Sequence, residues 1–96
     1  MKNKKYNMTD LNNVMESLLA ENGCPWDKVQ THETLKNYLI EESYEVVEAI
    51  DNKDSENLCE ELGDVLFQII FHSKLAEREN KFDFSDVVNN VTAKMI

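Results

Sequence analysis

The chain has 96 residues, 42% of them hydrophobic, and carries a formal net charge of −9 at pH 7. A negative charge of this size disfavours nonspecific binding to nucleic acid polymers and to anionic membrane surfaces. The length predicts one small domain, 1–96, of which 1–8 form a loose N-terminal segment. Glycine (2) and proline (1) are scarce, which favours an all-α fold because strand-rich chains need these residues in their turns.

Cysteine usage and hydropathy indicate the compartment. Cys24 and Cys59 form no CxxC pair, a pattern typical of reduced thiols in a cytoplasmic protein. No apolar run is long enough to span a membrane, and the stretch MKNKKYNM lacks the apolar region of a signal peptide. The sequence therefore predicts a soluble cytoplasmic protein.

The first predicted helix covers about 9–20, where apolar residues recur at helical spacing. Thr9 or Asp10 is expected to cap its start. The following stretch, 21–30, contains a glycine and the only proline, so we expect a loop there.

Three further helices are predicted in the rest of the chain. The second is expected over 31–51 with Thr31 as its N-cap, and the third over 55–79. The fourth begins after Asp83, which has the spacing of a capping residue, and runs to the end of the chain. Four helices with short connections predict an antiparallel helical bundle, which a chain this small is expected to complete by oligomerisation.

On the second predicted helix, a carboxylate interrupts the apolar stripe. At 100° per residue, Glu42 falls in the middle of that stripe, Glu45 at its edge and Glu48 toward solvent. The stripe consists of Leu35, Leu39, Val46, Ala49 and Ile50.

The third predicted helix carries polar residues along one edge of its apolar face. Glu61, Asp64 and Gln68 lie on that edge. Phe67 and Phe71 lie on the opposite side, so this helix is expected to be central, with a second subunit over its far face. The stripe itself comprises Leu58, Leu62, Val65, Leu66, Ile69 and Ala76.

Two carboxylate pairs on facing helices would repel each other in a small volume. Glu42 with Glu45, and Glu61 with Asp64, are i, i+3 pairs, and no Lys or Arg in either helix lies at the right angle to neutralise them. Divalent cations would compensate this charge; oxygen ligands suit Mg²⁺, Mn²⁺ or Ca²⁺, and a small open site favours Mg²⁺. The alternative is that these residues are solvated helix faces.

Several motifs resemble the MazG family of nucleoside triphosphate pyrophosphohydrolases, over about 10–96. They are GCPWD, QTHETL, YLIEESYEVVEAI, LCEELGDVLFQIIFHSKLAE and FDFSDVV. The family's EExxE and ExxD signature reads here as EESYE, 41–45, and ELGD, 61–64. The resemblance implies an all-α fold shared between the subunits of a homodimer or homotetramer. It also implies Mg²⁺-dependent hydrolysis of a nucleoside triphosphate to the monophosphate and pyrophosphate.

The resemblance also assigns roles by position. Glu42, Glu45, Glu61 and Asp64 would be Mg²⁺ ligands, with Mn²⁺ as a substitute. Glu41 would orient or deprotonate the attacking water, although the family pattern leaves the base open among Glu41, Glu42 and Glu45.

Three residues outside the signature are candidates for substrate contact. Trp26 could stack on a nucleobase, with packing over a bundle end as the alternative. Lys28 and Lys94 could meet a triphosphate, with full solvation as the alternative.

The end of the chain departs from the family pattern. Family members continue past the fourth helix with a basic, histidine-containing tail of the form RRHPHVF, whereas this chain stops at VTAKMI. One rival interpretation is therefore a MazG-like metal- or nucleotide-binding module with weakened catalysis. A di-iron bundle is disfavoured because neither His32 nor His72 has a Glu three residues before it.

Overall fold

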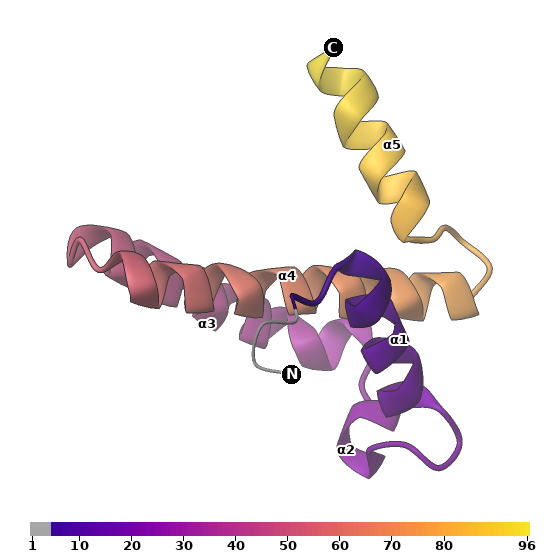
Figure 1. Ribbon diagram of the computed structural model, residues 1–96. Coiled ribbons are helices and arrows are strands. Elements are labelled where there is room, and N and C mark those ends of the chain that lie inside the picture. The colour runs from indigo at the N-terminus through magenta and orange to yellow at the C-terminus, as the bar shows by residue number, and fades with distance from the viewer. Residues whose placement is uncertain (1–4) are drawn as a thin grey trace. The chain divides into compact units, whose positions relative to one another are not determined.

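The computed structural model describes residues 5–96, and this part of the chain is all-α, as predicted (Figure 1). The chain divides into two compact units, one reaching Gln30 and the other Thr31–Ile96, and each is described by itself. The helices are α1 (Met8–Leu19), α2 (Pro25–Lys28), α3 (His32–Asp51), α4 (Ser55–Arg78) and α5 (Phe84–Met95). Among these residues, no helix combines the length and the apolar character needed to cross a membrane.

The first unit contains α1, whose start differs from the prediction. Asn7 is the N-cap, and its side chain accepts a hydrogen bond from the backbone N–H of Asp10, whose carboxylate accepts one from the N–H of Asn7. Asp10 is thus the reciprocal partner in a capping box and not the cap, and Thr9 lies inside the helix. Residues 1–4 of the expected loose segment lie outside the described part, and the helix already begins at Met8.

The stretch 21–30, predicted as a loop, contains the one-turn helix α2. Pro25 occupies its first turn, where a fixed φ suits the helix and the missing N–H has no partner to lose. Gly23 precedes it, and a Cβ at this position would collide with the backbone carbonyl oxygens of Ser17 and Leu18. Only glycine therefore allows the chain to turn so closely under the end of α1.

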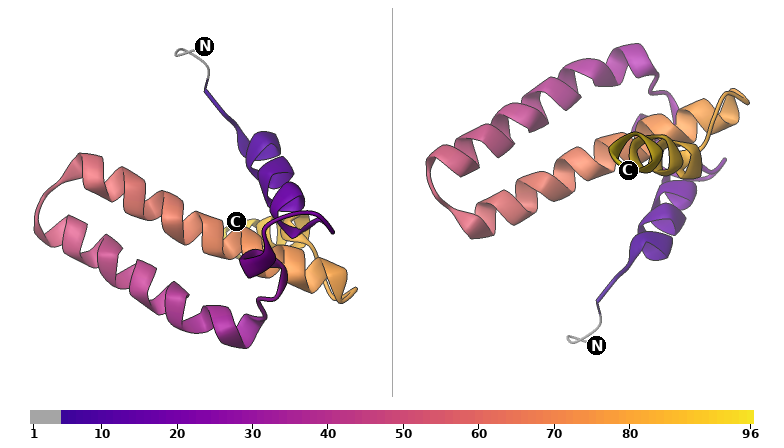
Figure 2. Two further views of the ribbon diagram at one scale, coloured as in Figure 1. Left: turned by 90° about the horizontal axis from the view of Figure 1, so that it is seen from below. Right: turned by 90° about the horizontal axis from the view of Figure 1, so that it is seen from above.

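In the second unit, α3 and α4 form an antiparallel helical hairpin (Figure 2). Thr31 caps α3 as predicted, in a reciprocal box with Thr34. At the other end, Lys53 adopts a positive φ of 54°, and the N–H of Asp54 donates to the Ala49 carbonyl. This Schellman closure ends α3, and Asp54 then caps α4, so the reversal takes three residues.

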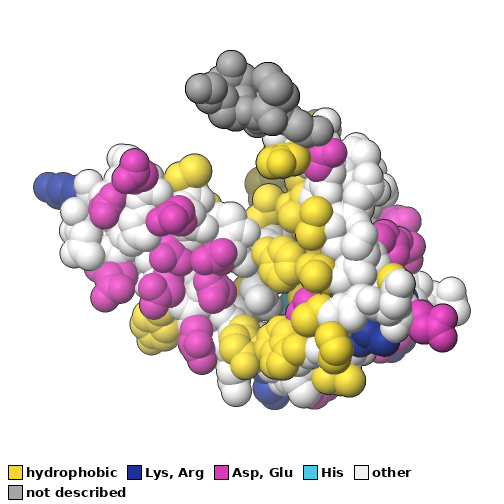
Figure 3. All heavy atoms as spheres, turned by 60° about the horizontal axis from the view of Figure 1, so that its bottom comes forward, with side chains coloured by type: hydrophobic (Ala, Val, Ile, Leu, Met, Phe, Trp, Pro, Cys, Tyr) yellow, Lys and Arg dark blue, Asp and Glu magenta, His cyan; other side chains and the backbone are white. Residues whose placement is uncertain are grey.

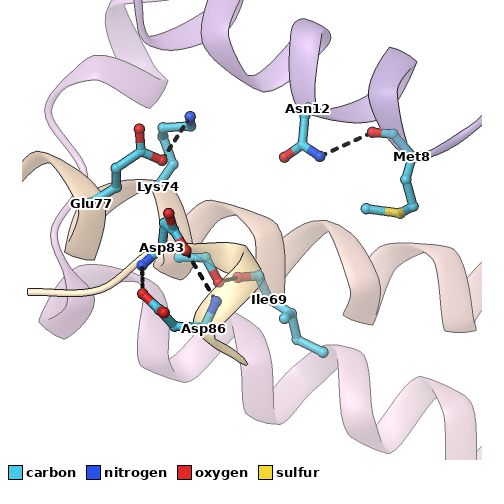
Figure 4. A network of polar contacts seen from close by, with 8 residues as sticks. Met8, Asn12, Ile69, Lys74, Glu77, Asp83 and Asp86 are labelled. Carbon is cyan, nitrogen blue, oxygen red and sulfur yellow. Dashed lines mark hydrogen bonds and ion pairs between the residues drawn. The ribbon is translucent and has the colours of Figure 1, made fainter. Parts of the chain in front are cut away.

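The connection from α4 to α5 is hydrogen-bonded at both ends. Asn80 has a φ of 60°, and the N–H of Lys81 donates to the Ala76 carbonyl, which closes α4 with a second Schellman motif. Asp83 caps α5 as predicted, in a reciprocal box with Asp86 (Figure 4). The helix α5 contacts α4 and has no buried residue.

The buried side of α4 differs from the predicted stripe. The helical wheel predicts Leu62 and Ile69 on the core face, yet they are 51% and 39% exposed. Phe71, placed on the far side, is 1% exposed and meets Phe67 edge to face, with centroids 6.1 Å apart. The wheel fixes only the angles between residues, so it could not say which side of the helix packs.

Candidate metal and catalytic site

Three carboxylates meet across the α3–α4 hairpin. One oxygen from each of Glu42, Glu61 and Asp64 lies within 4.8 Å of the other two. Glu42 comes from α3 and the other two from α4, because the antiparallel pairing sets the middle of α3 opposite the N-terminal half of α4. We call these three residues the carboxylate cluster. Acidic side chains gather on this end of the hairpin in the space-filling view (Figure 3).

The cluster is electrostatically strained without a counter-charge. Partial desolvation, then the nearby Asp64, Glu45 and Glu41 carboxylates, raise the pKa of Glu42 above its ordinary value. Partial desolvation, then Glu45, Asp64 and Glu42, raise the pKa of Glu61 in the same direction. Each of these effects penalises the charged form, so a cation at this position would relieve all of them together.

The donor atoms of the cluster fit a hard divalent cation. All three are carboxylate oxygens, which are the ligands that Mg²⁺ and Mn²⁺ prefer. One helical turn after Asp64 along α4, Gln68 has a buried amide oxygen, Oε1, without a hydrogen-bond partner among the described residues. An acceptor left in this state costs free energy unless a cation or water satisfies it. The residues present therefore suit the Mg²⁺ that the family resemblance implies.

The other two signature residues lie beside the cluster. Glu45 is exposed and falls outside the group of oxygens within 4.8 Å, although its charge acts on both Glu42 and Glu61. Glu41 is also exposed, and its charge acts on Glu42. The structure thus brings together three of the four predicted ligands and sets Glu45 and Glu41 at the rim.

The predicted substrate-binding residues lie on other helices. Trp26 and Lys28 belong to α2 in the first unit; the indole is 51% exposed, and the Lys28 ammonium donates to the Glu21 carbonyl. Lys94 is exposed in the last turn of α5. The helix α5 contacts α4 and not α3, from which Glu42 comes.

One polar pair was missed by the sequence analysis. His32, at the start of α3, and His72, in the C-terminal half of α4, have their Nδ1 atoms 2.7 Å apart. The only sequence signal was two isolated histidines 40 positions apart, which no periodicity connects.

Comparison with known proteins places this arrangement in a family. The MazG nucleotide pyrophosphohydrolase domain matches residues 30–96, the stretch that holds the hairpin, the carboxylate cluster and α5. The chain belongs to this family.

Individual relatives support the assignment. The chain is 48% identical over 83 residues to the uncharacterized protein YabN of Bacillus subtilis, a match covering 86% of this chain and 17% of that protein. It is also 48% identical over 87 residues to the nucleoside triphosphate pyrophosphohydrolase/pyrophosphatase MazG of Thermotoga maritima. This match covers 91% of this chain and 34% of the Thermotoga maritima protein. The nucleoside triphosphate pyrophosphohydrolase of Escherichia coli K12 is 48% identical over 75 residues, a match covering 78% of this chain and 28% of that protein. The chain thus spans about a third or less of the length of these relatives.

Proposed function

We propose that the chain hydrolyses a nucleoside triphosphate to the nucleoside monophosphate and pyrophosphate in a Mg²⁺-dependent reaction at the carboxylate cluster. The observation that carries this proposal is the meeting of Glu42, Glu61 and Asp64, while no positive charge from residues 5–96 contributes to the pKa shifts of Glu42 and Glu61. The names of two relatives supply the substrate class, since both are nucleoside triphosphate pyrophosphohydrolases.

The roles of the residues follow from their places around the cluster. Glu42, Glu61 and Asp64 would hold Mg²⁺, and Glu45 would join them by a side-chain rotation from the rim. When bound, Mg²⁺ supplies a water of lowered pKa and neutralises the charge on the departing pyrophosphate. Mn²⁺ is expected to substitute, because it accepts the same oxygen donors.

Glu41 is proposed to accept the proton of the attacking water. It neighbours the cluster but lies outside the group of three, so its carboxylate remains available for a proton. The water oxygen forms a bond to the α-phosphorus, and the bond from that phosphorus to the pyrophosphate oxygen breaks. The proton moves to the Glu41 carboxylate and is then released to solvent.

Contacts to the rest of the substrate are proposed for Trp26, Lys28 and Lys94. The exposed indole offers a face for base stacking, and the two ammonium groups suit the triphosphate. For Lys28, the contact requires its side chain to leave the Glu21 carbonyl, which costs one hydrogen bond.

A panel of nucleoside triphosphates with Mg²⁺, scored separately for pyrophosphate and orthophosphate, tests the proposal. We expect pyrophosphate from the wild type, none after EDTA, and none from Glu42→Gln or Asp64→Asn. Glu48→Gln is the matched control, because Glu48 is an exposed residue of the same helix outside the cluster. Activity that survives complete chelation would overturn the mechanism.

Two further readouts separate the roles within the site. Glu41→Gln should lower kcat while keeping Mg²⁺ binding, whereas Glu42→Gln should lose both. Calorimetry that shows Mg²⁺-dependent nucleotide binding by the wild type without any hydrolysis would instead establish a binding module.

We also propose that the working form contains at least two copies of the chain.

A further inference from the structure

A line of polar residues runs along the side of α4 that faces α3. The line, which at 100° per residue spans an arc of about 80°, consists of Glu61, Asp64, Gln68 and His72. At one end, Glu42 of α3 meets Glu61 and Asp64 in the carboxylate cluster. At the other end, His32 of α3 has its Nδ1 atom 2.7 Å from that of His72. Because both ends of the line contact α3, Gln68, which lies between them, faces α3 as well.

Gln68 carries an acceptor that no described residue satisfies. Its Oε1 atom is one of two buried side-chain polar atoms without a hydrogen-bond partner within residues 5–96. An amide oxygen can accept two hydrogen bonds, and burying it with none costs free energy. A methionine or leucine would fill a similar volume without this cost. Gln68 therefore lowers stability at a position where an apolar residue would suit the fold, as residues that serve a ligand commonly do.

The position of Gln68 relative to the carboxylate cluster limits which part of a substrate could reach it. At a rise of 1.5 Å per residue, Gln68 lies about 6 Å along the helix axis from Asp64 and about 10 Å from Glu61. In the proposed reaction, the α-phosphorus is the atom attacked at the cluster. The groups bonded to the α-phosphate, the pyrophosphate on one side and the sugar on the other, are therefore the parts of the substrate within this reach.

The chemistry of the acceptor selects the sugar. Ionised phosphate oxygens only accept hydrogen bonds, so the pyrophosphate has no donor for the amide oxygen. A sugar hydroxyl group donates one. We propose that Oε1 of Gln68 accepts a hydrogen bond from a hydroxyl group of the substrate's sugar. The nucleoside then lies toward the His32–His72 pair and the pyrophosphate toward the turn between α3 and α4. This inference rests on the proposed hydrolysis, because the cluster sets where the α-phosphate lies.

The first test needs no nucleotide. Gln68→Met and Gln68→Leu remove the unpaired acceptor and keep a side chain of similar volume, so each should raise the melting temperature of the chain in EDTA. Two variants are used because one apolar shape could pack poorly against α3. A lower melting temperature from both would show that Oε1 is already satisfied in the free protein, and it would overturn the proposal.

The second test compares nucleotides that differ only in their sugar. Calorimetry in Mg²⁺ measures the Kd of a nucleoside monophosphate and of its 2′-deoxy, 3′-deoxy and 2′,3′-dideoxy analogues. The base is that of the triphosphate hydrolysed fastest in the panel, or adenine if none is hydrolysed. We expect the wild type to bind the dideoxy analogue about tenfold more weakly than the ribonucleotide, and Gln68→Met to bind the two equally. The two singly deoxygenated analogues assign the hydroxyl group.

Leu66→Met is the matched control. Leu66 is a half-buried residue about 160° around α4 from Gln68, so this variant changes packing without removing an acceptor and should keep the wild-type ratio of Kd values. A ratio that Gln68→Met leaves unchanged would overturn the proposal. If the same variant also weakened Mg²⁺ binding without nucleotide, Oε1 would belong to a metal-bound water instead. A wild type that hydrolyses triphosphates but binds all four monophosphates equally would refute the sugar contact and leave the proposed reaction intact.

Discussion

The Nδ1 atoms of His32 and His72 lie 2.7 Å apart and join the first turn of α3 to the C-terminal half of α4. The two rings are within 6° of parallel, with centroids 5.0 Å apart. That separation is close to the Nδ1–Nδ1 distance plus one ring radius at each end, so the rings lie end to end in one plane. This is the geometry of an N–H···N hydrogen bond and not of face-to-face stacking.

The protons in this pair can be assigned from its surroundings. Nε2 of His72 is buried and has no hydrogen-bond partner within residues 5–96, while Nε2 of His32 lies 3.9 Å from a Glu79 carboxylate oxygen. The arrangement that buries no unpaired N–H has His72 donating through Nδ1 to His32, whose Nε2–H faces Glu79.

Acid should weaken the hairpin through His72. Burial, and then the neighbouring His32, lowers the pKa of His72 below its ordinary 6.5. The unfolded chain consequently binds a proton before the folded chain does, so stability is full above pH 6.5 and falls as the pH drops below it. Urea unfolding in EDTA at pH 7.5 and 5.5 measures this loss. His72→Gln should cost about 1 kcal/mol at pH 7.5 and show a smaller loss on acidification; an unchanged pH dependence would refute the assignment.

The carboxylate cluster should destabilise the metal-free chain at neutral pH. Desolvation and neighbouring carboxylates raise the pKa of Glu42 and Glu61 in the folded chain above the ordinary pKa of 4.5. The folded chain is therefore stabilised by protons bound below pH 4.5, and this stabilisation is lost as the pH rises through the folded-state pKa. In EDTA at pH 7.5, Glu42→Gln should therefore raise the melting temperature. Added Mg²⁺ should raise that of the wild type and not that of Glu42→Gln. Glu48→Gln, on the same helix, should respond to Mg²⁺ as the wild type does.

Replacing each of the two glycines by alanine should change the free energy of unfolding in opposite directions. A Cβ at Gly63, inside α4, would meet nothing within 4 Å, so Gly63→Ala should raise the free energy of unfolding by roughly 0.5–1 kcal/mol through helix propensity. A Cβ at Gly23 would collide with the Ser17 and Leu18 carbonyl oxygens, so Gly23→Ala should lower it. Urea titrations of both variants give the signs, and stabilisation by Gly23→Ala would contradict the turn geometry.

The positive φ at Lys53 should make a glycine variant more stable than an alanine variant at this position. Lys53→Gly should stabilise the chain by up to about 1 kcal/mol relative to Lys53→Ala, because only glycine adopts φ 54° without strain from its Cβ. Both variants remove the same charge, so their difference isolates the backbone. Inside a helix, the alanine variant would instead be the more stable of the two. A more stable Lys53→Ala variant would therefore show that the Schellman closure does not form.

The sequence by itself determined the local features of this protein. The caps at Thr31 and Asp83 followed from residues three or four positions apart, as did the all-α class and the i, i+3 spacing of Glu61 with Asp64. These features depend on hydrogen bonds and angles within one helix, which a short stretch of residues specifies. The sequence did not predict the cap at Asn7 or the helix α2, because more than one local arrangement suited the same residues.

Only the tertiary structure decided which residues meet. The pairing of α3 with α4 brought Glu42 to Glu61 and Asp64, left Glu45 at the rim and joined the two histidines. It also buried Phe71 and exposed Leu62. A helical wheel gives the angle between two residues of one helix but neither the rotation of that helix against its neighbour nor the register between them. Side-chain packing across the interface sets both quantities, and it is the sum of many contacts between residues distant in the chain.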